Sequence, residues 1–437
     1  MEPDALHASK IFPGIRTRGI HTLPWTIVIL LIFYFSSYLV HAQEPCNWPC
    51  FHGPERTNRS PETGLMRSWP AEGPPLIWTA EGLGKGYSTV SFSDGMIYTS
   101  GMTDRQTFIY ALDLDGNLIW KKANGESWQT ELPWALTYDG ARSTPTCDSG
   151  VVYHLGELGR LTALSAETGD EIWSMELREV FAAEIPEYGY SESVLIEGTH
   201  LYCCPAGKEA YVVCLDKRTG EVIWKNNEIP GNVGFSSLIS FDMKGLHMLA
   251  GLSSNSIFCV DAATGRLLWT YPFENNRSNN IPDPIYFDGQ LFATSGYGKG
   301  SILLKMQSSD GQFNVTPVWQ SDLLDNLHGG VILHHGFLYG SGDNSRGWFC
   351  IDFKSGMPLW KSGGKGSITY ADGMLYCLDE RGTITLVQAT PRGYMPAGSF
   401  LVPEGGTGMH WAHPVICSHR LYIRHDNKLF VYDIDGS

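Results

Sequence analysis

The stretch Asp216-Lys-Arg-Thr-Gly220-Glu-Val-Ile-Trp224 recurs along the chain and decides its fold. The segments from Asp261 to Trp269 and from Asp352 to Trp360 repeat its Asp, its Thr-Gly or Ser-Gly pair and its Trp at the same spacing. Ser165 to Trp173 has Ser in place of the Asp, and Asp113 to Trp120 is one residue shorter. Repeats of this kind indicate an array of similar supersecondary units.

The repeated stretch is typical of a β-hairpin. Its Asp and Thr side chains bond nearby amides and its Gly adopts a positive φ, so the chain reverses between two strands. The second strand ends at the Trp, which buries a large ring and needs an acceptor for its indole N–H. We therefore expect each Trp to dock one sheet against the next. These structural docking residues are Trp78, Trp120, Trp173, Trp224, Trp269, Trp319 and Trp360.

The spacing of these tryptophans predicts the architecture. Counting Phe400, which stands where the next Trp is due, the positions lie 40 to 53 residues apart, as in a four-stranded propeller blade. A second hairpin with an Asp-Gly turn precedes the repeat, as in Ser93 to Tyr98. We predict an all-β fold, an eight-bladed β-propeller of four-stranded antiparallel blades.

The end of the chain predicts how the ring closes. Three strands follow Phe400, and the chain then stops without a strand that carries a Trp. Residues 75–79, around Trp78, supply the missing strand. Pairing this N-terminal strand with the last blade removes two open sheet edges.

Composition and charge limit the possible partners. The chain has 437 residues, of which 43% are hydrophobic and 49 are Gly, as expected for a large β core with many turns. Its formal net charge of -15 opposes binding to a phosphate backbone. We therefore expect no nucleic-acid partner, and we expect a monomer.

The N-terminus indicates export. Lys10, Arg16 and Arg18 precede an apolar run from Trp25 to Val40, and Val40-His41-Ala42 resembles a cleavage site. The run is long for a signal-peptide core and short for a transmembrane helix, which needs about 20 residues. Residues 1–42 are thus a signal peptide or a membrane anchor, residues 43–74 an N-terminal extension and residues 75–437 the propeller. The protein is predicted to be periplasmic or anchored to the membrane.

The cysteines divide into core residues and possible bridges. Cys214, Cys259 and Cys350 each stand two residues before the Asp of a repeat, so we expect small core side chains. Cys46 and Cys50 lie outside the repeats and are candidates for pairing. Adjacent residues on a strand point to opposite faces, which disfavours a functional bond within Cys203-Cys204 but leaves the redox state of this pair open.

The first strands of the blades predict a binding site at one mouth of the central channel. Aligning the repeats places small residues at one shared position: Ser88, Ser143, Ser191, Ser236, Pro282, Gly329, Ser367 and Ala412. Larger or polar residues precede most of them, and Glu192, Asp283 and His413 follow them. The predicted ligand-binding residues are Tyr87, Arg142, Tyr190, Glu192, Asp283, His328, Trp411 and His413. The alternative is that these groups bond one another and channel water.

The motif Asp-x-x-Thr-Gly-x-x-x-Trp resembles the tryptophan-docking repeat of the PQQ-like propeller superfamily, over roughly residues 75–437. The opening Trp48-Pro-x-x-x-Gly53-Pro54 and the closing Trp411-Ala-His-Pro414 also resemble exported BamB-like propellers of bacteria. The superfamily includes quinoprotein alcohol dehydrogenases, which bind pyrroloquinoline quinone (PQQ) and calcium, and the non-enzymatic BamB assembly factor. The resemblance predicts the fold more strongly than the function, because one fold hosts many unrelated sites.

Two functions follow from the resemblance. The favoured one is an exported, non-catalytic binding or assembly scaffold, which presents loops and the channel mouth to a protein or small ligand and needs no cofactor. The alternative is a PQQ- and calcium-dependent quinoprotein oxidoreductase. The resemblance then implies calcium ligands, an Asp base and an Arg, for which Glu192, Asp283 and Arg142 are nominated. No spacing aligns these residues with that family, no catalytic residue is assigned, and the chain has no Cys-x-x-Cys-His for a haem.

Overall fold

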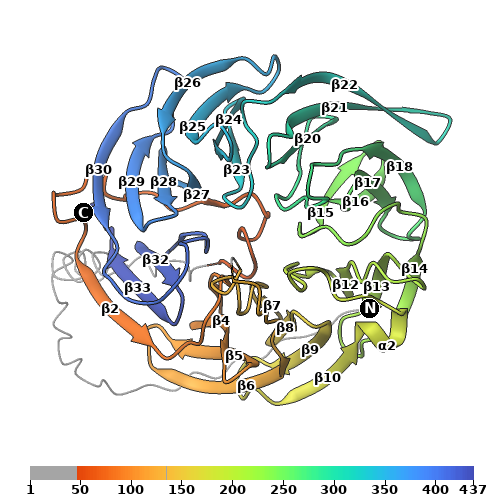
Figure 1. The fold of residues 1–437 in the computed structure, drawn as a ribbon, viewed down its shortest axis with the longest axis horizontal. Helices are drawn as coiled ribbons and strands as arrows, with labels where there is room; N and C mark the ends of the chain where they lie inside the picture. The colour runs from red at the N-terminus through yellow and green to blue at the C-terminus, as the bar shows by residue number, and fades with distance from the viewer. Residues whose placement is uncertain (1–46, 134) are drawn as a thin grey trace, which may run out of the picture. The chain divides into compact units, whose positions relative to one another are not determined.

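The computed structural model describes residues 47–133 and 135–437. These residues form eight sheets arranged in a ring around a central channel (Figure 1). Each sheet has four antiparallel strands, with the first at the axis and the fourth at the rim, and one sheet gains a fifth, parallel strand on its inner edge. The predicted all-β, eight-bladed propeller is confirmed.

The first four blades use consecutive strands, and a short helix, α2 (Leu177–Phe181), follows blade 2. Blade 1 contains β3 (Ser91–Ser93), β4 (Met96–Thr103), β5 (Gln106–Asp113) and β6 (Leu118–Glu126). Blade 2 contains β7 (Thr146–Asp148), β8 (Val151–Leu155), β9 (Arg160–Ser165) and β10 (Glu171–Glu176). Blade 3 contains β11 (Leu195–Glu197), β12 (His200–Cys203), β13 (Val212–Asp216) and β14 (Val222–Asn226). Blade 4 contains β15 (Ile239–Met243), β16 (Leu246–Leu252), β17 (Ser256–Asp261) and β18 (Leu267–Pro272).

The last four blades include the two strands that come from the N-terminal part of the chain. Blade 5 contains β19 (Ile285–Phe287), β20 (Gln290–Ser295), β21 (Gly300–Ser309) and β22 (Gln312–Ser321). Blade 6 contains β23 (Val331–His334), β24 (Phe337–Gly342), β25 (Gly347–Asp352) and β26 (Pro358–Gly363). Blade 7 contains β27 (Gly366–Ala371), β28 (Met374–Asp379), β29 (Thr383–Gln388) and β30 (Pro396–Leu401), with β1 (Arg59–Ser60) as an added fifth strand. Blade 8 contains β31 (Val415–Cys417), β32 (Arg420–His425), β33 (Lys428–Asp433) and β2 (Leu76–Glu81).

The ring closes through β2, as predicted. This strand pairs antiparallel with β33, and Leu76 lies opposite Tyr432 and Trp78 opposite Val431. The last blade is thereby completed by a strand from the start of the propeller, which leaves no unpaired edge at the junction.

The repeated tryptophans pack on the turn of the following blade. Trp224 donates its indole N–H to the Ala262 carbonyl at 3.0 Å, and its ring lies over Gly265. Gly265 has φ +72°, and a Cβ there would come within 2.3 Å of that ring. Other blades repeat the indole hydrogen bond to a carbonyl of the next blade, from Trp78, Trp120, Trp173, Trp319 and Trp360.

Blade 4 departs from this pattern. The Nε1 atom of Trp269 is buried and has no hydrogen-bond acceptor among the described residues. The next blade joins β21 and β22 by a tight turn at Asp310-Gly311, beyond two long strands, so it lacks the repeated Asp-x-x-Thr-Gly turn there. Trp269 therefore contributes its ring to the core without the hydrogen bond.

The core lies between neighbouring sheets. Cys214, Cys259 and Cys350 are fully buried free thiols, in the role expected for them. Cys50 is also a free thiol, so the suggested pairing of Cys46 with Cys50 is wrong. Cys203 and Cys204 are free and buried.

The N-terminal segment 1–42, for which we predict a signal peptide or membrane anchor, lies outside the described residues. Within residues 47–133 and 135–437, no helix is long and apolar enough to cross a bilayer.

Candidate functional site

Residues 47–60 enter the central channel, and we call this segment the plug (Figure 1). The Trp48 carbonyl accepts a hydrogen bond from the Phe92 amide in blade 1, at 2.8 Å. The Pro49 carbonyl accepts one from the Cys147 amide in blade 2, at 2.7 Å. The start of the plug is thus hydrogen-bonded to the innermost strands of blades 1 and 2.

Arg56 fixes the plug to blades 3 and 4. It is buried, and its guanidinium donates to the carbonyls of Ser193 at 2.9 Å, Leu238 at 3.1 Å and Val194. Each of these carbonyls lies at the start of an inner strand. The carbonyls thus pair with the two terminal nitrogens of Arg56, whereas its Nε is buried without a partner.

The end of the plug reaches blades 6 and 7. The Asn58 side-chain amide donates to the Ile368 carbonyl at 2.5 Å, and β1 runs parallel to β27. The Arg59 guanidinium lies 3.4 Å from Nδ1 of His334 in β23.

His52 connects the plug to blades 5 and 8. Its Nδ1 lies 3.3 Å from Oδ2 of Asp283, and its Nε2 lies 3.0 Å from Nδ1 of His413. Nε2 of His413 donates to the His328 carbonyl at 2.7 Å. With these contacts the plug touches all eight blades.

The hydrogen-bond directions fix how His52 meets His413. Burial, with a further effect from His52, lowers the pKa of His413 to about 3, so its ring is neutral. Because Nε2 of His413 carries the hydrogen, its Nδ1 is an acceptor and Nε2 of His52 donates to it. Oδ2 of Asp283 is buried and forms no hydrogen bond, although it lies 3.3 Å from Nδ1 of His52.

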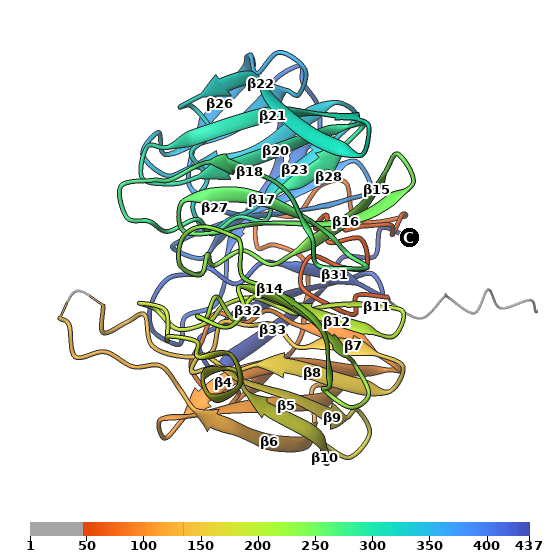
Figure 2. The same ribbon diagram turned by 90° about the vertical axis from the view of Figure 1, so that its right-hand side faces the viewer.

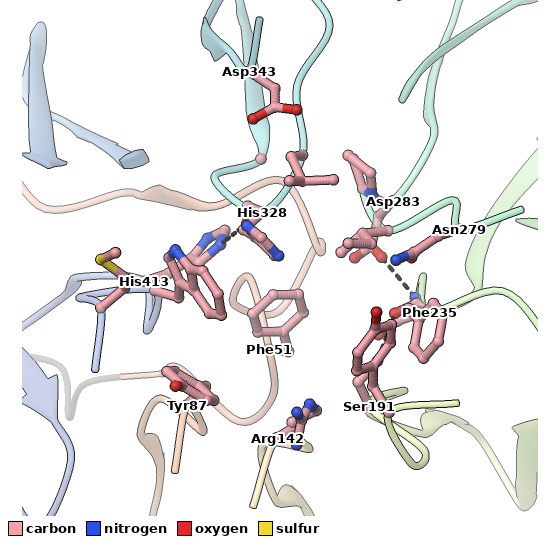
Figure 3. A pocket seen from close by; sticks show the side chains of 18 of the residues that line it. Phe51, Tyr87, Arg142, Ser191, Phe235, Asn279, Asp283, His328, Asp343 and His413 are labelled. Atoms are coloured by element: carbon pink, nitrogen blue, oxygen red, sulfur yellow. Dashed lines mark hydrogen bonds between the residues drawn. The ribbon is translucent and has the colours of Figure 1, made fainter. Parts of the chain in front are cut away.

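A cavity of about 750 Å³ lies at the channel mouth, with the plug as part of its wall (Figure 3). Figure 3 shows Phe51 of the plug at the centre of the view, among Tyr87, Arg142, His328 and Asp283. Aromatic side chains supply much of the wall: Phe51, Tyr87, Tyr138, Tyr188, Phe235, Tyr297 and Trp411. Concave sites of this size and mixed lining are typical of small-ligand pockets.

Two aromatic groups define the sides of the cavity. Trp411 stacks on the His328 ring with centroids 4.2 Å apart and lies 5.1 Å from the Tyr87 ring. On another part of the wall, the Tyr188 and Phe235 rings lie 6.1 Å apart. Burial lowers the pKa of His328 to about 3, so the stacked imidazole is neutral.

A loop of residues 127–133 and 135–140 projects from one face of the propeller (Figure 2). It packs against the mouth, because the Tyr87 hydroxyl donates to the Thr137 carbonyl and Lys85 donates to the Leu136 carbonyl at 3.1 Å. The loop therefore forms part of the rim of the cavity.

Six of the eight residues predicted for the ligand site line this cavity: Tyr87, Arg142, Asp283, His328, Trp411 and His413. The other two, Tyr190 and Glu192, lie outside it. Ser191, between them, faces the cavity instead.

The reason is a shift of one residue in the alignment of blade 3. The Thr89 amide donates to the Thr144 hydroxyl at 3.2 Å, and the Thr144 amide donates to the Ser193 hydroxyl at 3.0 Å. Ser193 is therefore the equivalent of Thr89 and Thr144, and Ser191 is the equivalent of Tyr87. Because side chains alternate along an extended strand, a shift of one residue turns Tyr190 and Glu192 away from the cavity.

Both displaced residues have partners elsewhere. The Tyr190 hydroxyl donates to the Pro205 carbonyl at 2.7 Å. Oε2 of Glu192 accepts a hydrogen bond from the Cys204 amide at 2.8 Å, whereas Oε1 is buried without a partner. Burial raises the pKa of Glu192 to about 8.

The plug residues Phe51 and His52 are among the lining residues that the sequence did not predict. The sequence signal that could have pointed to them is the Trp48-Pro and Gly53-Pro54 pattern, because such residues indicate a defined backbone conformation outside the repeats. That pattern gives no indication of which blades the segment meets.

The residues at the cavity do not fit a calcium ion. Calcium takes six to eight oxygen ligands, but Oδ1 of Asp283 accepts from the Ser237 amide at 2.6 Å and Oδ2 faces His52. Glu192 points to Cys204 rather than into the cavity. In the part of the chain that the structure describes, no three His, Cys, Asp or Glu side chains are grouped to hold a metal.

Known proteins resemble this chain in sequence and in fold. The family described as outer membrane protein assembly factor BamB matches residues 105–362. BamB from Yersinia pestis is 22% identical over 277 residues, which cover 60% of this chain and 67% of that protein.

Solved structures share the fold at low identity. BamB from Moraxella catarrhalis aligns with a TM-score of 0.57 and 14% identity, over 82% of this chain and 99% of that one. A europium-containing methanol dehydrogenase aligns with a TM-score of 0.63 and 14% identity, over 87% and 89% of the two chains. A quinohemoprotein alcohol dehydrogenase from Comamonas testosteroni aligns with a TM-score of 0.61 and 14% identity, over 91% and 81%. At this identity the structural matches show a common propeller fold alone, but the family match extends over more than half of the sequence. The chain belongs to the BamB family of β-propeller proteins.

Proposed function

We propose that this protein is an exported, non-catalytic scaffold that binds a protein or small ligand in the cavity at the channel mouth. The observation that supports the proposal is the plug, which fills the channel with contacts to every blade and leaves a walled cavity on one face. The name of the relatives, outer membrane protein assembly factor, supports a role in the assembly of other proteins outside the cytoplasm. The predicted N-terminal signal or anchor and the monomeric state belong to the same proposal.

A cross-linking experiment tests the scaffold function. Met409 lines the cavity and is 44% exposed, whereas Phe287 is 51% exposed at the end of β19 that points away from it. A photo-reactive amino acid at each position, in the full chain expressed in its own host, should give adducts from position 409 and not from position 287. Equal adducts from both positions, or none from position 409, would contradict the proposal.

The alternative, a PQQ- and calcium-dependent oxidoreductase, is disfavoured by the same geometry. Asp283 is already engaged by His52 and the Ser237 amide, and Glu192 does not reach the cavity. Incubation of the purified protein with PQQ and calcium should therefore give no alcohol-dependent dye reduction. Dye reduction that requires PQQ, calcium and alcohol would replace the scaffold proposal by the oxidoreductase.

A further inference from the structure

Two arginines in the cavity wall, Arg142 and Arg277, have no ion-pair partner among the described residues. Arg142 lines the cavity, and among the described residues no carboxylate lies within ion-pair distance of its guanidinium. In contrast, Lys365 lies 2.5 Å from Asp343 and 3.2 Å from Glu380. Arg142 is partly exposed, so its guanidinium can pair with an anion that enters the cavity.

The position of Arg142 is fixed by its surroundings. Its two terminal nitrogens donate to the Gly140 carbonyl at 2.9 Å and to the Tyr138 carbonyl at 2.5 Å. The guanidinium carbon lies 5.8 Å from the centre of the Tyr87 ring and 5.1 Å from that of Trp128. A guanidinium has five N–H donors, so donors remain for a ligand, and Figure 3 shows the group directed into the cavity.

The carboxylates of the cavity wall are engaged by groups other than its two arginines. Arg142, Arg277 and Lys365 face the cavity together with Asp283, Asp343 and Glu380. Asp343 and Glu380 pair with Lys365, and Asp283 accepts from the Ser237 amide. The two arginines are therefore the groups of the wall that are open to an anionic ligand.

The aromatic side chains of the wall favour a ligand that carries a flat ring. The rings of Trp411 and Tyr87 lie near Arg142, and Tyr188 and Phe235 lie on another part of the wall. Flat apolar groups pack well against such rings in offset or edge-to-face geometry. A planar anion group, in turn, matches the fork of a guanidinium.

We propose that the cavity binds an organic carboxylate that carries an aromatic ring, with the carboxylate on Arg142 and the ring among Tyr87, Trp411 and the opposite rings. The proposal rests on the binding function proposed above and names its ligand chemistry. Two sources offer this chemistry: a free aromatic acid, and the C-terminal residue of a polypeptide that ends in Phe, Tyr or Trp.

Calorimetric titration of the full propeller with N-acetyl-phenylalanine and with its primary amide tests the charge requirement. The two probes differ only in the carboxylate, so the acid should bind at least tenfold more tightly, as expected for a charge-assisted pair. Arg142→Gln should remove most of this difference. Arg218→Gln changes an exposed arginine in a blade turn, paired with Asp216 outside the cavity, and should leave binding unchanged.

The outcomes separate this proposal from the function on which it rests. Equal binding of acid and amide, or no binding of either, overturns the ligand class, whereas adducts from position 409 would still support a binding scaffold. An unchanged near-ultraviolet circular dichroism spectrum of Arg142→Gln shows that the variant is folded. If that variant fails to fold, Arg142→Lys keeps the charge but loses the fork and should weaken the acid alone. A longer peptide that ends in Phe binds more tightly than N-acetyl-phenylalanine if the source is a polypeptide terminus, and no more tightly if it is a small molecule.

Discussion

Replacing Glu192 by Gln should remove a large part of the pH dependence of stability. Burial, the main cause, raises the pKa of Glu192 from 4.5 to about 8 in the folded protein. In the unfolded chain the carboxyl titrates near its ordinary value. Between pH 4.5 and pH 8 the folded state therefore holds a proton that the unfolded state has lost, and stability falls as the pH rises.

The size of the effect follows from the shift in pKa. One pKa unit corresponds to about 1.36 kcal/mol, so the interval between 4.5 and 8 corresponds to about 5 kcal/mol of unfolding free energy at most. Below pH 4.5 the contribution is fully present, and above pH 8 it is lost and no longer changes. A Gln at this position stays neutral, and its carbonyl oxygen can still accept the Cys204 amide hydrogen bond.

Denaturant unfolding of both proteins at pH 5, 6.5 and 8, followed by tryptophan fluorescence, measures the difference. We expect similar stability at pH 5 and a variant that is more stable by several kcal/mol at pH 8. Other titrating groups are common to both proteins and cancel in the subtraction. Parallel pH profiles for wild type and variant would show that Glu192 is ionised in the folded state and would refute the reasoning.

Three further changes test the packing of the blades and the plug by thermal or denaturant unfolding. Gly265→Ala should destabilise the fold by about 2–4 kcal/mol, because φ is positive there and a Cβ would meet the Trp224 ring. Gly245 also has a positive φ but faces open space, so Gly245→Ala should cost about 1 kcal/mol. Equal losses would contradict the docking geometry. Trp224→Phe should lower the free energy of unfolding by about 1 kcal/mol more than Trp269→Phe, because only Trp224 donates an indole hydrogen bond. A larger loss for Trp269→Phe would contradict the assigned hydrogen bonding. Arg56→Gln should cost about 3 kcal/mol through its three carbonyl partners, and a neutral result would mean that the plug adds little to stability.

The blades could be predicted from sequence because the signal is local and repeated. The turn in each copy lies within nine residues, and the Trp that follows it is conspicuous, so the count of blades and the closure by Trp78 followed directly. The site was predictable only in part. Tyr190 and Glu192 were misplaced because the alignment matched the small residue Ser191 to Ser88 and Ser143, whereas the strand register makes Glu192 their equivalent.

The plug could not be predicted for a different reason. Its partners are separated from it by up to 361 residues, as for His52 and His413. No periodicity relates a segment at the axis to the strands around it. Arg56 and Asn58 bond backbone carbonyls, which every residue offers, so their targets leave no pattern in the sequence.

The path of the plug sets an order for folding. Residues 47–60 are synthesised before any blade, yet their partners are spread around the entire ring and His413 is among the last residues made. Contacts of such long sequence separation form slowly, because the entropy of closing a large loop is lost before the contacts stabilise the chain. The plug is therefore synthesised before the blades but is among the last segments to be fixed in its folded position. A chain interrupted before blade 8 would expose both its open sheet edges and a vacant axis to chaperones and proteases.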